Sequence, residues 1–412
     1  MIADYCNCER LIREYADKSF CMFFRESGGQ INYKFIVPGA CYPQELWDWD
    51  SWLTDVALGD ITTDDISEYE KGCVLNFLEH IRPDGWMPID ITPVKCMPPF
   101  DESDVVPGHK TNTHKPCLAQ HALYVSEKLN DFSWLDGYFD KFEKYIGFYF
   151  ENCFHAPTGL YFWLDDCAIG VDNDPCAFYR PDGSCASIYL NSLMYRELLA
   201  LSALAAHFDA EKSDFYAKKA ETLGNAIREN CWDERNGFFY SVDINLKPIT
   251  KNFLHLGAPR HWNGLIQRID VWTGFMPLWA GIATPEQAKR VVEENYRNEK
   301  TFNCNGGIRT LSKLEKMYRV QPSGNPSCWL GPVWGISNYM VFKGLLDYGY
   351  FDDAVSICEK TIKLFADDIE KNGAMHEYYD PDTCEGVNNL GFQSWNLLVA
   401  GMVKWYSENV IK

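Results

Sequence analysis

Three acidic segments, far apart in the sequence, carry the side chains best suited to chemistry. The first is Trp47-Asp48-Trp49-Asp50-Ser51-Trp52, in which carboxylates alternate with indoles. Carboxylates can bind the hydroxyl groups of a sugar while aromatic rings stack on its apolar face. The aspartates could also cap the helix expected to follow them. The two roles are compatible, so Trp47, Trp49 and Asp50 are candidate sugar-binding residues.

The second acidic segment covers residues 165–175 and contains four carboxylates within ten residues: Asp165, Asp166, Asp172 and Asp174. A simple turn does not need so many acidic residues, which indicates that one of them is a general acid. The alternative is turn chemistry, because Asp172-Asn173-Asp174-Pro175 also has the composition of an Asx turn.

The third acidic segment covers residues 376–386, and its carboxylate of interest is Glu377. Residues 380–386 have the composition of a turn, whereas Glu377 precedes two tyrosines, as in a partly enclosed strand. Because charged groups are rarely enclosed without a partner or a function, Glu377 is a candidate catalytic residue.

A fourth segment, Trp329-Leu330-Gly331-Pro332-Val333-Trp334, places small residues between two tryptophans. Such residues allow the backbone to approach a ligand closely, although a tight junction between a loop and a helix would look the same. Trp329 and Trp334 are therefore further candidates for the sugar site.

Two separated carboxyl groups over an aromatic floor suit the hydrolysis of a glycosidic bond. One, protonated, donates to the leaving oxygen, and the other, ionised, activates water. The sequence has no G-x-S-x-G, no G-x-x-x-x-G-K-[ST] and no H-E-x-x-H motif. The alternatives are a phosphorylase, an epimerase that relies on His255, His261 and His376, and a sugar-binding protein without activity.

The elements that must position these side chains are helices. Apolar residues recur at helical spacing in twelve stretches, at about 4–19, 48–58, 64–80, 112–130, 132–153, 189–207, 211–230, 271–280, 285–297, 332–348, 351–369 and 391–408. The connection after each even-numbered stretch is short. The connection after each odd-numbered stretch is long, at about 20–47, 82–111, 154–188, 231–270, 298–331 and 370–390.

Helices joined by a short loop lie antiparallel and side by side, so this alternation places all six long loops at one end of the bundle. We call these the crown loops. The prediction is an all-α (α/α)6 toroid that forms a single domain over residues 1–412, with short strand-like pieces such as Gly237–Val242 that form small β-hairpins in the crown. A division into two domains near residues 208–212 is the alternative, but the alternation continues across it. Asp50, Asp172 and Glu377 all fall at the crown end.

Composition narrows the class of partner. The chain has 38 basic and 58 acidic residues and a net charge of −20, which disfavours nucleic acid. No charged leader and no long apolar run are present, so a cytoplasmic protein without a membrane partner is expected. The sixteen cysteines include no C-x2-C pair, and we interpret them as reduced thiols rather than a metal site. We expect no cofactor, and the sequence does not indicate an oligomeric state.

At these residues the chain resembles the inverting (α/α)6 glycosidases of glycoside hydrolase family 63, which are related to trehalase. It is most similar to the compact bacterial mannosylglycerate and glucosylglycerate hydrolases. The segments that carry the resemblance are Leu46–Trp52, Gly170–Pro175, Pro277–Glu286, Gly331–Trp334 with Asn338–Tyr339, and His376–Pro381. They extend over nearly the whole chain.

The resemblance implies an exo-acting α-glycosidase that inverts the anomeric carbon of a small α-linked glucoside. It places the general acid on Asp172 and the general base on Glu377. The sugar site would contain Trp47, Trp49, Asp50, Trp329, Trp334 and Gln393.

Two departures bear on the substrate. Cys176 stands where relatives often have a basic residue, and residues 335–337 also differ from the family pattern. The basic residues of the crown loops, namely Arg180, Arg260, His261 and Arg309, are candidates for binding an anionic aglycone such as glycerate.

Overall fold

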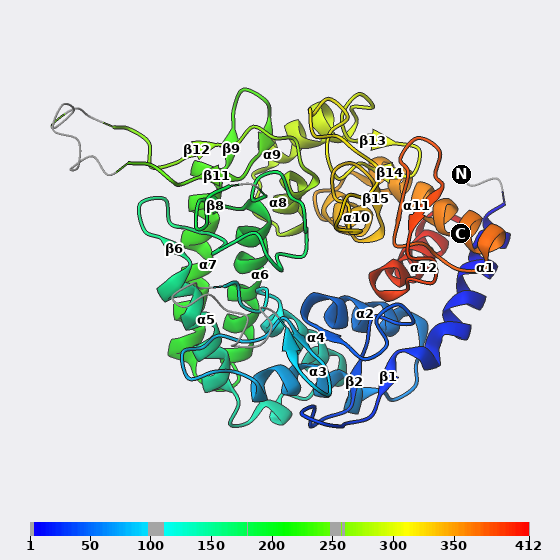
Figure 1. The fold of residues 1–412 in the computed structure, drawn as a ribbon, viewed down its shortest axis with the longest axis horizontal. Coiled ribbons are helices and arrows are strands. Elements are labelled where there is room, and N and C mark those ends of the chain that lie inside the picture. The colour runs from blue at the N-terminus through cyan, green and yellow to red at the C-terminus, as the bar shows by residue number, and fades with distance from the viewer. Residues whose placement is uncertain (1–3, 98–110, 179, 248–256, 258–259, 412) are drawn as a thin grey trace.

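In the computed structural model the helices form two concentric rings (Figure 1). The structure describes residues 4–97, 111–178, 180–247, 257 and 260–411. The inner ring consists of α2 (Asp48–Ile61), α4 (Leu118–Leu129), α6 (Ile188–Ala205), η6 (Trp272–Phe275) with α8 (Met276–Trp279), α10 (Gly335–Asp347), and η8 (Ser394–Leu398) with α12 (Val399–Tyr406). The outer ring consists of α1 (Tyr5–Ser19), α3 (Ser67–Glu79), α5 (Phe139–Asn152), α7 (Ala210–Asn230), α9 (Pro285–Arg290) with η7 (Val291–Tyr296), and α11 (Phe351–Asn372).

The inner ring is closed. Helix α2 contacts α4, and the contacts continue through α6, α8 and α10 to η8 and α12, which return to α2. On the outside, α1 packs against α11 and α12, so the first and last parts of the chain lie together. The fold is the predicted (α/α)6 toroid.

The two rings differ in how much of each helix is buried. Ten of the fourteen residues of α2 are buried, compared with six of the twenty-one residues of α7. An inner helix has neighbours on several sides and is buried over most of its surface, whereas an outer helix needs one apolar face. Each outer helix therefore supports an inner one and exposes its charged face to solvent.

The predicted helices are confirmed, with corrections at some of their ends. Residues 112–117 are not helical: the backbone N–H of His114 donates to the carbonyl of Met87, and α4 begins only after Pro116. Pro332 is not in a first helical turn, because β15 (Val333–Trp334) pairs with β16 (Tyr378–Tyr379) before α10 begins. Thr284 caps α9 with a complete capping box, as its sequence indicates.

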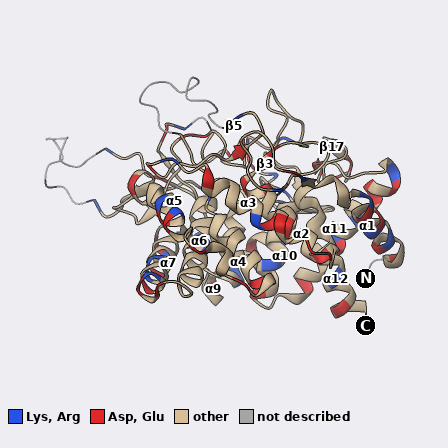
Figure 2. Ribbon diagram, turned by 90° about the horizontal axis from the view of Figure 1, so that it is seen from below, with Lys and Arg blue, Asp and Glu red and all other residues tan. Residues whose placement is uncertain are grey.

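Short antiparallel strands shape the crown loops, which lie on one side of the helices (Figure 2). Three-stranded sheets join β3 (Leu46–Trp47), β4 (Asp90–Ile91) and β5 (Cys96–Met97); β8 (Cys185–Ala186), β11 (Val242–Asp243) and β12 (Leu265–Ile266); and β15, β16 and β17 (Gly386–Asn388). Hairpins pair β1 (Phe24–Arg25) with β2 (Phe35–Ile36), β6 (Phe154–His155) with β7 (Leu160–Tyr161), β9 (Trp232–Asp233) with β10 (Phe238–Phe239), and β13 (Asn303–Cys304) with β14 (Gly307–Ile308). These sheets tie the first acidic segment, through β3, and the third, through β16 and β17, to neighbouring loops.

Two further observations concern the whole chain. All sixteen cysteines are described and have free thiols, and Cys73 and Cys358 are fully buried within α3 and α11. Within the described residues, no helix combines the length and the apolar character that a bilayer crossing requires.

Substitution of Gly72 tests the close contact between α3 and the residues that precede β2. A Cβ atom at Gly72 would lie 1.8 Å from the carbonyl oxygen of Lys34. Gly72→Ala should therefore lower the free energy of unfolding by about 1–3 kcal/mol, measured by urea denaturation. Gly147, inside α5, is the matched control, since nothing lies within 4 Å of its Cβ position. Gly147→Ala should raise stability by about 0.5–1 kcal/mol. Equal stability of the two variants would contradict this packing.

Candidate active site

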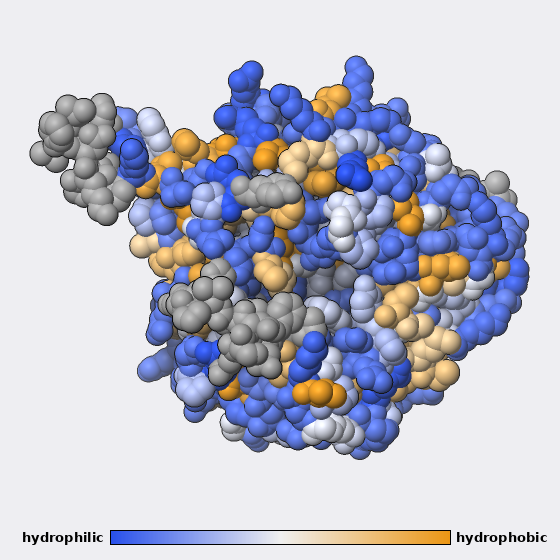
Figure 3. Space-filling model, in the orientation of Figure 1, coloured by the Kyte–Doolittle hydropathy of each residue, from blue (hydrophilic) through white to orange (hydrophobic). Residues whose placement is uncertain are grey.

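A cavity of about 430 Å³ opens at the crown end of the inner ring. The crown face, drawn space-filling in Figure 3, is hollowed near the centre of the ring and is mostly hydrophilic around it. The described residues that line the cavity are Tyr42, Trp47, Trp49, Asp50, Ile89, Lys115, Asp166, Cys167, Ala168, Gly170, Asp172, Phe178, Asn325, Ser327, Trp329, Trp334, Glu377, Phe392 and Trp395. They come from five of the six crown loops and from the first turns of inner helices, so distant parts of the chain share one pocket.

The floor of the cavity rests on a closed circuit of six aromatic rings. In order around the circuit, the rings are Trp49, Tyr189, Trp272, Trp329, Trp334 and Trp395, with successive centroids 5.8, 6.5, 6.0, 3.9, 6.2 and, back to Trp49, 4.9 Å apart. Trp329 and Trp334 are stacked, with an angle of 9° between their planes. The four tryptophans of this circuit that line the cavity give it an apolar wall that a sugar can contact. Trp329 and Trp334 are each 1% exposed, and their ring faces are stacked on each other and on Trp272 and Tyr378.

Asp172 and Glu377 both line the cavity, and the charge of Asp172 acts on the carboxyl group of Glu377. Burial raises the pKa of Asp172, while hydrogen bonds from the side chains of Ser327 and Asn325 oppose this effect. Burial also raises the pKa of Glu377 to about 7, and the charge of Asp172 adds to it. The side-chain amides of Asn388 and Asn389 donate to Oε2 of Glu377 at 3.0 and 2.6 Å and favour its ionised form. The two carboxyl groups therefore have different partners in one pocket.

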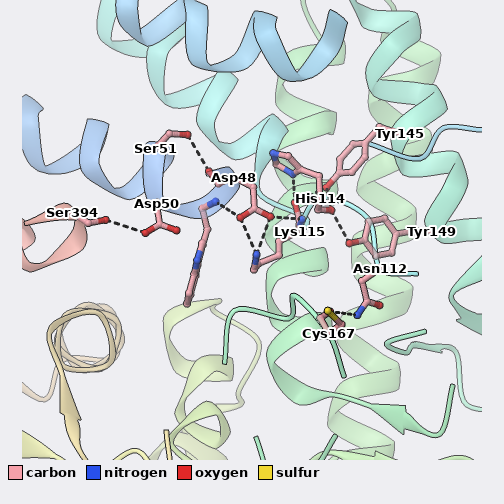
Figure 4. A network of polar contacts seen from close by, with 11 residues as sticks. Asp48, Asp50, Ser51, Asn112, His114, Lys115, Tyr145, Tyr149, Cys167 and Ser394 are labelled. Carbon is pink, nitrogen blue, oxygen red and sulfur yellow. Dashed lines mark hydrogen bonds and ion pairs between the residues drawn. The ribbon is translucent and has the colours of Figure 1, made fainter. Parts of the chain in front are cut away.

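Asp50 is a third carboxyl group of the cavity and is only 6% exposed. Burial and the neighbouring charge of Asp48 raise the pKa of Asp50 to about 8, although Lys115 opposes the shift. The hydroxyl of Ser394 donates to Asp50 Oδ1 at 3.2 Å (Figure 4). At neutral pH, Asp50 is thus mainly a neutral acid that can both donate and accept hydrogen bonds.

A buried ion pair lies beside these carboxyl groups. Lys115 Nζ lies 2.8 and 2.9 Å from the two carboxylate oxygens of Asp48, and the Lys115 backbone N–H donates to Asp48 Oδ2 at 3.0 Å. The Lys115 side chain is 2% exposed and that of Asp48 is fully buried. Burial opposes ionisation, but Lys115 holds the pKa of Asp48 below its usual range. Lys115 Nζ also lies 5.6 Å from the centre of the Trp49 ring.

The segment that carries Lys115 is fixed from several sides (Figure 4). The hydroxyls of Tyr145 and Tyr149, both on α5, donate to the carbonyls of Lys115 and His114 at 2.6 and 2.8 Å. Asn112 donates to Asp165 Oδ1 and to the carbonyl of Cys167, both at 2.8 Å. The segment therefore joins the start of α2 to the loop that contains Asp172.

Seven of the residues singled out from the sequence meet in this cavity: Trp47, Trp49, Asp50, Asp172, Trp329, Trp334 and Glu377. Gln393 lies outside the described lining, and its Oε1 accepts a hydrogen bond from the Ala40 backbone at 2.8 Å. Trp52, which lies in α2, and the loop residues Trp86, Trp163 and Trp262 do not line it either.

The basic crown residues also lie outside the described lining. Arg180 is paired with Asp243, and Arg260 donates to the Lys247 carbonyl at 2.9 Å. His261 is exposed. Arg309 is 4% exposed and pairs with Asp382 at 2.8 Å, so it holds crown loops together. His255 lies outside the described residues.

Several lining residues were missed in the sequence, above all Lys115 and Trp395. Lys115 was assigned to a helix, although the dipeptide Lys115-Pro116 could have indicated that α4 begins later. Trp395 lies at the start of an inner helical segment, as Trp49 and Trp334 do, and this shared position was the available signal. Nothing local marks Tyr42, Asn325 or Ser327.

The sequence matches the model of a protein family over residues 42–395, described as the mannosylglycerate hydrolase MGH1-like glycoside hydrolase domain. Mannosylglycerate hydrolase of Thermus thermophilus is 26% identical over 233 residues, which cover 56% of this chain and 48% of that protein. A probable trehalase of Saccharomyces cerevisiae is 25% identical over an alignment 418 residues long, which covers 85% of this chain and 50% of that protein. The chain thus spans about half the length of these curated relatives.

Solved structures show the same fold. The crystal structure of a GH63 mannosylglycerate hydrolase from Thermus thermophilus in complex with glucose matches with a TM-score of 0.68 and 21% identity, over 96% of this chain and 99% of that chain. Neutral trehalase Nth1 from Saccharomyces cerevisiae matches with a TM-score of 0.63 and 19% identity, over 90% of this chain and 73% of that chain.

Removal of Lys115 should destabilise the protein, because Asp48 would remain as an unpaired buried charge. We expect Lys115→Met to lower the free energy of unfolding by about 3–5 kcal/mol, measured by urea denaturation. The double variant Asp48→Asn/Lys115→Met should recover much of this loss. Lys404, in the exposed pair with Asp60, is the control, and Lys404→Met should cost about 1 kcal/mol or less. Equal losses for the two lysine variants would argue against a buried pair of this importance.

Proposed function

Because the chain belongs to the mannosylglycerate hydrolase MGH1-like glycoside hydrolase family, we propose that it is an inverting, exo-acting α-glycosidase that hydrolyses a small α-linked glucoside. The observation that supports this most directly is that Asp172 and Glu377 share one cavity over an aromatic floor. A pocket with a floor accepts the terminal sugar of a substrate, which is why we propose an exo-acting enzyme.

In this proposal Asp172 is the general acid. Burial raises its pKa and keeps a larger fraction of the carboxyl group protonated than in water. The protonated group donates its proton to the glycosidic oxygen as the bond to the anomeric carbon breaks. Ser327 and Asn325 hydrogen bond to Asp172 and orient it.

Glu377 is the general base in the same proposal. The side-chain amides of Asn388 and Asn389 stabilise its ionised form, which accepts a proton from the attacking water. The water attacks from the side opposite the leaving group, so an α-linked substrate first gives the β-anomer. The proton passes from Glu377 to solvent after each turnover, and Asp172 takes one up.

The sugar would contact Trp49, Trp329, Trp334 and Trp395, with Asp50 beside its hydroxyl groups. A neutral Asp50 can accept a hydrogen bond from one hydroxyl and donate to another. Trp47 borders the same part of the cavity. The tryptophans and Asp50 orient the sugar, whereas Asp172 and Glu377 are the groups that react.

A glycosylglycerate is the second candidate substrate class, because mannosylglycerate hydrolases are among the relatives. A phosphorylase would require phosphate, so turnover in a phosphate-free assay argues against it. An epimerase would need a histidine in the pocket. His261 is exposed and His376 is bound to Asp368 at 2.9 Å, and neither is among the described lining residues.

Substitution of the two proposed catalytic residues tests their roles. Asp172→Asn and Glu377→Gln should each lower kcat by about 10²–10⁴-fold on the best substrate of a panel of α-linked glucosides and mannosides. Thermal unfolding should show that both variants remain folded. Asp182→Asn and Glu385→Gln, exposed residues of the same two crown loops, are matched controls with near-normal activity. Near-normal turnover in Asp172→Asn or Glu377→Gln would remove that residue from its role.

Proton NMR of the first sugar released tests the stereochemistry. We expect the β-anomer to appear first from an α-linked substrate, because one carboxyl group activates water directly. The α-anomer should then grow in by mutarotation at the rate of the free sugar. An initial α-anomer would overturn the proposed division of roles.

The dependence of kcat/KM on pH tests Glu377 as the base. Because this group must be ionised and its pKa is raised to about 7, activity should fall as the pH drops below about 7. Asn388→Ala removes a donor to the ionised form, so the midpoint of this acid limb should move to higher pH. Asn305→Ala, whose amide donates to the Asp382 carbonyl in the crown, is the control. An unchanged acid limb in Asn388→Ala would indicate that another group sets it.

A further inference from the structure

Acidic side chains outnumber basic ones around the cavity. Four described lining residues carry a carboxyl group: Asp50, Asp166, Asp172 and Glu377. A fifth carboxyl group, Asp48, binds the lining residue Lys115, which balances its charge. Within the described part of the lining, Lys115 is the single residue with a positive charge.

The charge of Lys115 is already neutralised. Its ammonium group lies within 2.9 Å of both carboxylate oxygens of Asp48 and close to the face of Trp49. The two side chains are buried together, with exposed fractions of 2% and 0%. Recruitment of Lys115 to a substrate carboxylate would leave Asp48 as a buried charge without its partner, which is unfavourable.

Three other cations of the crown are held by other groups. Arg180 comes near, since it shares a small crevice with Asp166, but its guanidinium pairs with Asp243. Arg309 is bound to Asp382 and to backbone carbonyls. Lys313 pairs with the same Asp382 at 2.6 Å. None of these three side chains lines the described part of the cavity.

The position of the aglycone follows from the proposed mechanism. If the terminal sugar lies on the tryptophan floor and Asp172 protonates the leaving oxygen, the aglycone must lie toward the mouth of the cavity. Cys167 and Asn325 are the exposed residues of the described lining, and Asp166, next to Cys167, is partly exposed. They provide a carboxyl group, a thiol and an amide, and no positive charge.

A carboxylate on the aglycone would thus be taken from water into a pocket that already contains several acidic groups. A buried charge needs a partner of opposite sign or several hydrogen-bond donors, and the described lining has no free cation to provide one. Hydroxyl groups, in contrast, can hydrogen bond to Asp166 and Asn325 at no electrostatic cost. We infer that this site selects glycosides whose aglycone is an uncharged, hydroxyl-bearing group and rejects those with a carboxylate. This inference rests on the proposed glycosidase function.

A matched pair of substrates tests the inference: 2-O-α-D-glucosylglycerol and 2-O-α-D-glucosylglycerate. They share the sugar and the linkage and differ only in a hydroxymethyl group against a carboxylate. We expect kcat/KM for the neutral compound to be at least about tenfold higher, because juxtaposed like charges oppose binding. Equal values, or a preference for the glycerate, would overturn the inference.

Asp166 provides the second arm of the test. Asp166→Asn removes one acidic group from the mouth without a change in shape, so it should reduce the preference for the neutral substrate by about threefold or more. Asp182→Asn, in the same crown loop but outside the described lining, is the matched control and should leave the preference unchanged. If the two variants have the same preference as the unmodified protein, the carboxyl groups of the cavity do not set selectivity and the inference fails.

The design separates this inference from the proposed function. If no glycoside of the wider panel is hydrolysed, the proposed function fails and the inference fails with it. If the panel contains a substrate but neither member of the pair is turned over, the two are compared as competitive inhibitors of that substrate. The neutral compound must then bind at least about tenfold more tightly, and weaker discrimination would overturn the inference while the glycosidase function stands.

Discussion

The buried ion pair between Asp48 and Lys115 is the contact on which the site depends. Removal of two charges from water is costly, and it is offset only when their geometry is good and further hydrogen bonds complete it. Here Asp48 receives both ammonium contacts and the backbone N–H groups of Lys115 and Trp49. The pair therefore fixes the first turn of α2, which carries Asp50 and Trp49, against a segment that also holds the Asp172 loop through Asn112.

Enclosure of several carboxyl groups in one cavity sets their protonation. Burial raises the pKa of Asp50, Asp172 and Glu377, since each ion loses water, and neighbouring acidic groups add to the shifts of Asp50 and Glu377. Their hydrogen-bond partners then distinguish them. Glu377 accepts from two side-chain amides, whereas Asp50 accepts from one hydroxyl. Groups of the same chemical type can in this way hold different charges at one pH, as an acid and a base in a single reaction require.

The relation to the family appears at two levels. The fold matches the Thermus thermophilus structure over nearly the whole of both chains, and trehalases are among the relatives. At one position near the Asp172 segment, the side chain departs from the family pattern. Cys176, which stands where a basic residue was expected from the resemblance, is fully buried and outside the described lining, so the side chain at this position provides no charge to the cavity.

The sequence by itself determined the ring of helices and the end at which the site lies. The spacing of apolar residues and the alternation of short and long connections are local properties, and they place Asp50, Asp172 and Glu377 at one end. Tertiary structure alone decided which crown side chains reach the cavity. Asn173 binds the backbone of Trp329, and Ser394 binds Asp50, across 156 and 344 residues of chain. A loop without its own repeating hydrogen bonds takes its conformation from the residues that pack against it. Long-range contacts of this kind therefore decide that Lys115 and Trp395 line the cavity while Arg180 and Gln393 lie outside it.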